Sequence, residues 1–96
     1  MPRLTVSNLV PTVIQENLNR NSLLIQQASL IRVIVGFDAP ISVTNYGVDL
    51  GPCDVDGLGT IIYGTGGHYA FDDDTRRVYL LAIGAPAEVN VVEQSR

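Results

Sequence analysis

Acidic residues are the side chains of this sequence that could most readily bind a metal ion. Three consecutive aspartates, Asp72 to Asp74, lie in the stretch YAFDDDTRRVYLLAI. Carboxylate oxygens bind Ca²⁺, but a calcium loop alternates its ligands and needs a glycine for its sharp turn. This run has neither feature, and aspartate also favours turns because its side chain accepts hydrogen bonds from nearby backbone. We therefore interpret DDDT as a solvated hairpin turn between two strands.

A second acidic group lies in the stretch VDLGPCDVDGLG, which contains Asp49, Asp54 and Asp56. The letters DVDG match half of a calcium-binding loop. The glutamate that would complete such a loop is missing, so we interpret the segment as a plain connecting loop.

Nucleophiles and general bases are scarce. His68 is the single histidine and Cys53 the single cysteine. One histidine is too few for a His-rich metal site, and no GxSxG context supports a Ser-His-Asp triad. Cys53 has no neighbouring His or Asn partner in the sequence, so we expect an inert thiol, and a lone cysteine excludes an intramolecular disulfide. These residues predict a non-enzymatic protein with no catalytic residue, no metal and no cofactor.

The stretch GTGGH, residues 64–68, could suggest a phosphate-binding loop. A P-loop requires a lysine after its glycines, and the sequence contains no lysine. We interpret the glycines as the tip of a hairpin, where a positive φ favours this residue.

Composition narrows the class of protein. The chain has 96 residues, is 46% hydrophobic and 17% charged, and carries a formal net charge of −4. An acidic balance argues against binding to nucleic acid. No apolar run approaches the length of about 18 residues that a membrane span requires. Residues 1–10 also have no apolar core of signal-peptide length, so we expect synthesis in the cytoplasm. The low charge suggests that other subunits cover part of the surface, so we expect a homo-oligomer.

Short apolar stretches separated by turn residues predict an all-β fold. We expect a single antiparallel β-sandwich or jelly-roll-like barrel of about seven to nine short strands. Residues 1–16 would form an N-terminal arm or an edge strand, and residues 17–96 the sandwich domain. A short helix within residues 11–24 is the weaker alternative, because three asparagines lie in that stretch. The expected strands are 22–27, 30–37, 41–44, 48–50, 60–63, 68–71, 77–84 and 88–94.

The order of several motifs resembles small β-sandwich proteins of tailed-bacteriophage virions, of the head-decoration and head-fibre-base type. That family shows an Asn-x-x-Arg turn, an apolar strand, a Gly-Phe pair, a Gly-x-x-Leu-x-Pro segment and two apolar closing strands. The matching residues are Asn17 and Arg20, Leu23 to Gln26, Gly36 and Phe37, Gly47, Leu50 and Pro52, Val78 to Ile83, and Val89, Val91 and Glu93. The match covers residues 15 to 94. It departs from the pattern at Gln27, where Asn is usual, in the order of Gly51 and Pro52, and in an extra residue within YLLAI.

The resemblance implies a non-enzymatic structural protein on the capsid exterior of a virion, synthesised in the host cytoplasm. Its partner would be the major capsid protein, bound by a decoration, cement or fibre-base subunit. The threefold sites of a capsid would favour a trimer. The residues that we expect at the contacts are Arg20, Arg32, Arg76, Arg77 and Tyr79, together with residues 1–16.

The alternative class is a free-standing carbohydrate- or ligand-binding β-module. Such a module uses an aromatic platform, and the sequence has no Trp and four tyrosines to build one. The tyrosines are Tyr46, Tyr63, Tyr69 and Tyr79.

Overall fold

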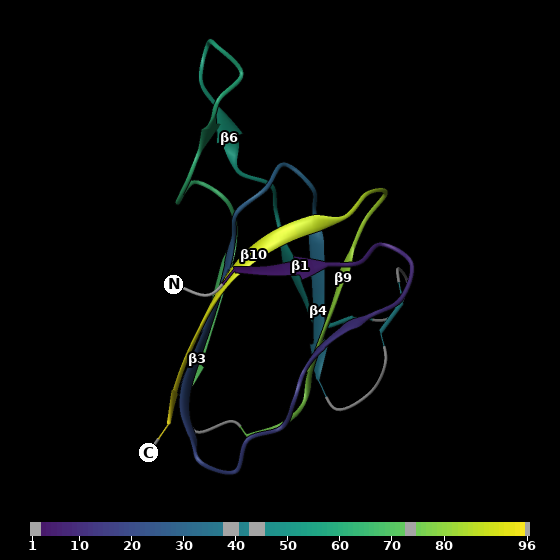
Figure 1. Cartoon of the computed structure of the whole chain (residues 1–96), viewed down its shortest axis with the longest axis vertical. Helices are drawn as coiled ribbons and strands as arrows, with labels where there is room; N and C mark the ends of the chain where they lie inside the picture. The colour runs from purple at the N-terminus through teal and green to yellow at the C-terminus, as the bar shows by residue number, and fades with distance from the viewer. Residues whose placement is uncertain (1–2, 38–40, 43–45, 73–74, 96) are drawn as a thin grey trace.

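The chain folds as a β-sandwich of two four-stranded sheets, from which a small ribbon projects (Figure 1). The computed structural model describes residues 3–37, 41–42, 46–72 and 75–95. In spatial order, the first sheet contains β1 (Arg3–Val6), β10 (Ala87–Ser95), β3 (Arg20–Gln27) and β8 (His68–Asp72). The second contains β2 (Thr12–Ile14), β9 (Val78–Ala82), β4 (Val33–Phe37) and β5 (Val48–Leu50). The ribbon pairs β6 (Asp54–Val55) with β7 (Ile61–Ile62).

The prediction of an all-β antiparallel sandwich is confirmed. Each pairing between described strands is antiparallel. The weaker alternative, a helix within residues 11–24, is wrong, because this stretch contains β2 and the start of β3. In the part of the chain that the structure describes there is no helix, and so none that could cross a membrane.

Two of the expected hairpins are wrong. β8 pairs with β3 and β9 pairs with β4, so the segment DDDT connects the two sheets instead of closing a hairpin. Asp72 ends β8, whereas Asp73 and Asp74 lie outside the described residues. The glycines of residues 64–67 also do not close a hairpin, since β7 pairs with β6 and β8 with β3. The stretch interpreted as a loop contains the short strand β6. Of the expected strand 41–44, residues 43 and 44 are not described.

The core lies between the two sheets, and its side chains come from alternate positions of the strands. Its buried side chains come from six strands and are Val6, Leu23, Ile25, Val33, Val35, Leu50, Val78, Leu80, Ala82, Ala87 and Val89. In a strand, successive side chains point to opposite faces, so every second residue of β4 and β9 reaches this core.

The outer face of β4 and β9 is covered as well. Ile34, Tyr79 and Leu81 form a second buried cluster with Ile41, which follows β4. A Cβ atom added at Gly36 would collide with the Ile41 side chain, so the glycine allows this residue to lie against the strand. Both faces of these central strands are therefore buried, which explains their continuous apolar sequence.

Arg20 is fully buried, and its guanidinium joins three segments that are distant in sequence. Its Nε donates to Glu93 Oε2 at 2.6 Å, and its Nη1 and Nη2 donate to the carbonyls of Arg76 and Gln15, each at 2.8 Å. We expected Arg20 to contact another subunit, but its side chain is fully buried within its own chain. The side chain serves inside the fold, because its donors are directed to acceptors of its own chain.

The described part of residues 1–16 belongs to the sandwich. β1 forms one edge of the first sheet beside β10, and β2 forms one edge of the second sheet beside β9. We expected either an arm or an edge strand, and the described residues of this segment form edge strands.

Replacing Arg20 with methionine should strongly destabilise the protein. We expect the free energy of unfolding to fall by about 3–5 kcal/mol, because a partly buried carboxylate and two carbonyls lose their donor. Urea unfolding followed by circular dichroism measures the change. Arg32→Met is the matched control, since it removes an exposed guanidinium and should leave the urea midpoint near that of the parent protein. Equal shifts in the two variants would contradict the role assigned to Arg20.

Candidate docking site

The two side chains that we considered as a nucleophile or a general base, Cys53 and His68, lie in different environments. His68 is exposed at the start of β8, and Cys53 is buried with its Sγ donating to the Gln27 carbonyl at 3.4 Å. Among the residues that the structure describes, no group of three or more His, Cys, Asp or Glu side chains could hold a metal ion.

The residues expected at subunit contacts fall into two separate places. Arg76, Arg77 and Tyr79 lie at the start of β9, whereas Arg32 lies beside its other end, where its carbonyl accepts from Ile83. The Arg76 guanidinium lies over the Phe37 ring, 4.7 Å from its centroid. These residues do not form one patch.

The cations of this set have partners within the chain. The Tyr79 ring is buried and its hydroxyl accepts from Arg77, which also forms a two-pronged ion pair with Glu16. These hydrogen bonds, that of Tyr79 first, raise the pKa of Arg77. Arg32 donates to Asp49 at 2.7 Å, which raises the pKa of Arg32. The Tyr79 ring belongs to the second buried cluster, so little of it is exposed in the single chain.

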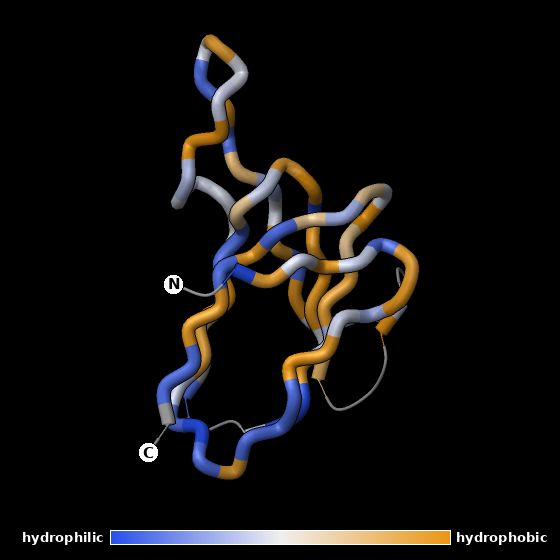
Figure 2. The backbone as a smooth tube through the Cα atoms, in the orientation of Figure 1, coloured by the Kyte–Doolittle hydropathy of each residue, from blue (hydrophilic) through white to orange (hydrophobic). Residues whose placement is uncertain are grey.

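The ribbon of β6 and β7 is the strongest candidate for a docking site. It leaves the sandwich between β5 and β8 and projects beyond the body of the molecule, with apolar residues at its tip (Figures 1 and 2). Four of its apolar side chains are exposed: Val55 by 47%, Leu58 by 91%, Ile62 by 41% and Tyr63 by 58%. We call residues 53–65 the projecting hairpin.

The projecting hairpin cannot bury its own apolar residues. Val55 lies opposite Ile61, and Asp54 lies opposite Ile62. Because alternate residues point to opposite faces, Ile61 and Ile62 place an aliphatic side chain on each face of the ribbon. A two-stranded ribbon has no layer to cover either face and is only marginally stable alone. A partner surface would remove these side chains from water.

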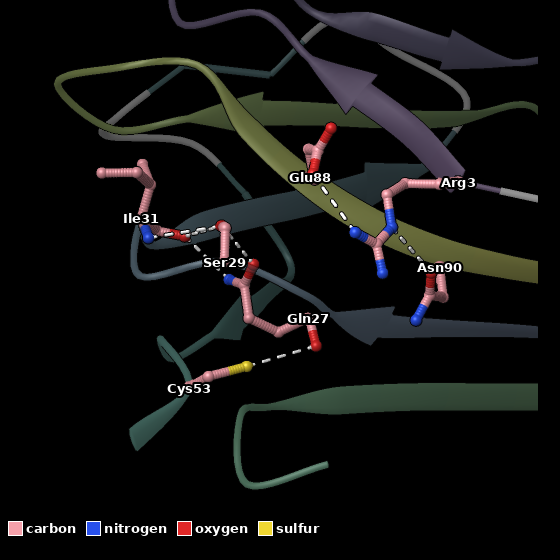
Figure 3. Close-up of polar contacts among 7 residues, drawn as sticks. All are labelled: Arg3, Gln27, Ser29, Ile31, Cys53, Glu88 and Asn90. Carbon is pink, nitrogen blue, oxygen red and sulfur yellow. Dashed lines mark hydrogen bonds and ion pairs between the residues drawn. The ribbon is translucent and has the colours of Figure 1, made fainter. Parts of the chain in front are cut away.

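Polar contacts fix the base of the projecting hairpin to the end of β3 (Figure 3). The Gln27 side chain is buried, and its Nε2 donates to the carbonyls of Ile31 at 2.8 Å and Leu50 at 3.1 Å. Ser29 Oγ donates to Gln27 Oε1, and the Ser29 carbonyl accepts from the backbone of Cys53. These bonds hold the departure point of the hairpin, and the Gly67 carbonyl, which accepts from the Gln27 N–H at 2.9 Å, holds the chain just after its return.

Two glycines allow the returning chain to pack against this base. A Cβ at Gly66 would lie 2.8 Å from Gln27 Cβ and 2.9 Å from Cys53 Sγ, and one at Gly67 would lie 2.8 Å from the Leu50 Cα. Gly64 has a positive φ of 91°. The expectation that positive φ accounts for this glycine stretch therefore holds at Gly64, while close packing accounts for Gly66 and Gly67.

The tip is a closed turn organised by Asp56. Its Oδ1 accepts from the backbone N–H of Leu58 at 2.8 Å and of Thr60 at 3.0 Å, and Gly59 has a positive φ of 82°. The hydrogen bond from Thr60, followed by that from Leu58, lowers the pKa of Asp56. This carboxylate thus shapes the turn that presents Leu58.

The charge of the projecting hairpin is negative. It contains Asp54 and Asp56 and has no Lys or Arg. A cation from the body approaches its base, where the Arg3 guanidinium lies 5.4 Å from the Tyr63 ring centroid. A complementary surface would be apolar with cationic groups at its rim.

Sequence reasoning did not select this site. The sequence feature that could have indicated it is the segment GLGTIIYG. Glycines flank this segment, and its three consecutive apolar residues do not alternate with polar ones. We expected residues 60–63 to form a strand of the sandwich, and a strand is present at Ile61–Ile62, but it pairs with β6 in the exposed ribbon. No protein-family model matches the chain, and neither does a curated protein or a solved structure.

Gly66→Ala should loosen the base of the projecting hairpin. The added methyl would overlap Gln27 and Cys53, so we expect a loss of about 1–3 kcal/mol in the free energy of unfolding. Gly57→Ala is the control, because a Cβ there meets nothing within 4 Å. Urea midpoints report both variants. A midpoint of the Gly66 variant at or above that of the Gly57 variant would refute the assigned packing.

The turn at Asp56 should respond to acid. Because its pKa in the fold lies below the ordinary value of about 3.9, the ionised carboxylate stabilises the turn above that value. The stabilisation is lost as the pH falls through the lower pKa of the folded protein. The backbone amide shifts of Leu58 and Thr60, followed by NMR, report this titration. Asp56→Asn keeps an acceptor without a charge and should remove the titration, whereas a midpoint above 3.9 in the parent protein would contradict the assignment.

Proposed function

We propose that this chain is a non-enzymatic structural protein of a tailed-bacteriophage virion. It binds the major capsid protein on the capsid exterior, as a decoration, cement or fibre-base subunit, through the projecting hairpin. The observation that carries the attachment is the exposure of four apolar side chains on a ribbon whose base is fixed and whose tip is free. The motif order that resembles virion β-sandwich proteins supports the assignment to a capsid.

The energetics favour a docking role for these side chains. Removing one large aliphatic side chain from water contributes about 1.5–3 kcal/mol. Leu58 alone would therefore change an affinity by about tenfold to a hundredfold. Binding only to the assembled capsid would also shift the equilibrium toward assembly, which is how a cement protein stabilises a head.

The carbohydrate-binding alternative has less support from the geometry. Tyr79 is buried, and the Tyr69 ring packs against Phe37 with 6.0 Å between centroids. Tyr46 and Tyr63 are the exposed members of the set that we considered for an aromatic platform. Two exposed tyrosine rings, with no tryptophan, form a poor aromatic platform. The geometry therefore supports carbohydrate binding less than docking through the projecting hairpin.

The test is binding to heads assembled from a phage genome that lacks this gene. Fluorescently labelled protein is titrated onto purified heads, and the bound fraction is measured by sedimentation. Leu58→Ser should weaken binding by about tenfold or more. The matched control is Leu18→Ser, because Leu18 is 81% exposed but lies outside the hairpin. We expect its affinity to remain within about twofold of the parent protein.

Two results would overturn the proposal. Parent protein that does not bind the heads, together with specific binding on a glycan array, would replace it with the carbohydrate-binding module. Equal affinities for the two leucine variants would show that the hairpin is not the attachment site.

A further inference from the structure

Among the strands that the structure describes, β8 is the longest of those at the ends of the two sandwich sheets, and one of its edges pairs with no described strand. β8 has five residues and lies at the end of the first sheet, beside β3. A strand edge presents unpaired N–H and C=O groups, which natural proteins commonly protect with Lys or Pro. The sequence of β8, His-Tyr-Ala-Phe-Asp, contains neither. The feature is independent of the projecting hairpin and of the function proposed for it.

The register of β8 fixes which of its backbone groups face outward. The Gln27 N–H donates to the Gly67 carbonyl at 2.9 Å, and Gln26 lies opposite His68. Hydrogen-bonded and non-hydrogen-bonded pairs alternate along an antiparallel ladder. The N–H and C=O groups of His68, Ala70 and Asp72 are therefore directed away from β3, toward the free edge.

This edge is complementary to itself. If a second β8 pairs antiparallel with Ala70 opposite Ala70 of the other copy, His68 lies opposite Asp72 across the new interface, twice. The side chains of His68, Ala70 and Asp72 are exposed on the outer face of the sheet. An imidazole donor opposite a carboxylate acceptor is a favourable cross-strand pair. The same register makes the three outward-facing residues of each copy meet as hydrogen-bonded pairs.

The outer face of the sheet continues across such a junction. Ala70 lies beside Leu24, and Leu24 lies beside Val92, so the three form an apolar row across β8, β3 and β10. Polar rows flank it, with Gln26 beside His68 and Ser22 beside Asp72. Pairing through Ala70 joins the two apolar rows end to end and keeps polar rows beside polar rows.

We propose that two copies of this chain associate through their β8 edges, in a two-fold antiparallel pairing centred on Ala70. The two four-stranded sheets then become one continuous eight-stranded sheet. A two-fold contact uses the same surface on both copies and closes on itself. It differs from the threefold arrangement that the capsid resemblance led us to expect.

The pairing is tested by measuring mass with analytical ultracentrifugation over a range of concentrations. The full chain should form a dimer. His68→Asp places two carboxylates opposite each other at both ends of the junction and should weaken the dimer by about fivefold or more. The double variant His68→Asp with Asp72→His exchanges the two side chains, restores the pairing in this register and should recover the dimer.

A second variant tests the backbone pairing. Ala70→Pro removes an N–H that faces the free edge, so it leaves the hydrogen bonds to β3 in place and should give a monomer. Ala70→Val retains the N–H and should still dimerise. Circular dichroism reports whether each variant is folded. If Ala70→Pro does not fold, the exchange of His68 and Asp72 tests the pairing instead.

Several outcomes would refute the inference. These are a parent protein that is monomeric throughout the range, a trimer, or a dimer that His68→Asp leaves unchanged. Failure of the exchange variant to recover the dimer would also refute the register. Because Leu58→Ser leaves β8 unaltered, loss of the dimer in that variant would assign self-association to the projecting hairpin instead.

Discussion

Burial of the Arg20 guanidinium is the constraint on which the sandwich depends most. A cation removed from water must find acceptors, and these come from Glu93 of β10 and from the connections that precede β3 and β9. Asn17 also donates to Glu93, at 3.2 Å. Three positions of the motif that resembles virion proteins thus meet at one network. Asn17, Arg20 and Glu93 are placed together by the requirements of the fold, independently of any partner.

Short apolar stretches separated by turn residues were enough to predict an all-β sandwich. Alternate residues of its central strands, Val33 and Val35 in β4 and Val78 and Leu80 in β9, face the core. The fate of Arg20 was not predictable, because an arginine is usually exposed and its partner lies 73 positions away along the chain. The hairpins failed for a related reason. Turn residues show where a strand ends, but they do not show which sheet the next strand joins, and β8 and β9 join different sheets.

The molecule combines a heavily constrained body with a lightly constrained projection. In the body, both faces of β4 and β9 are buried, so their side chains are fixed by neighbours on all sides. The projecting hairpin has local turn hydrogen bonds and a fixed base, while its apolar side chains face water. Segments with few buried contacts open at a lower free energy than the core, and binding surfaces are often drawn from them. The candidate site was missed from sequence because exposure depends on where the ribbon lies, and residue type does not reveal this.

The two ends of the chain are neighbours in the sandwich, since β1 pairs with β10 and β2 pairs with β9. During synthesis, β1 and β2 must therefore wait for β10 and β9 before either sheet has its full width. Such distant pairings impose a large loop-closure entropy and slow the folding of β-sandwiches. During that interval the apolar strands in the middle of the chain lack their covering layer. Such exposed apolar strands on neighbouring nascent chains can aggregate. The turn at Asp56 is closed by local hydrogen bonds and needs no distant strand. The tip of the projecting hairpin, which is exposed in the folded protein, can therefore form early in folding.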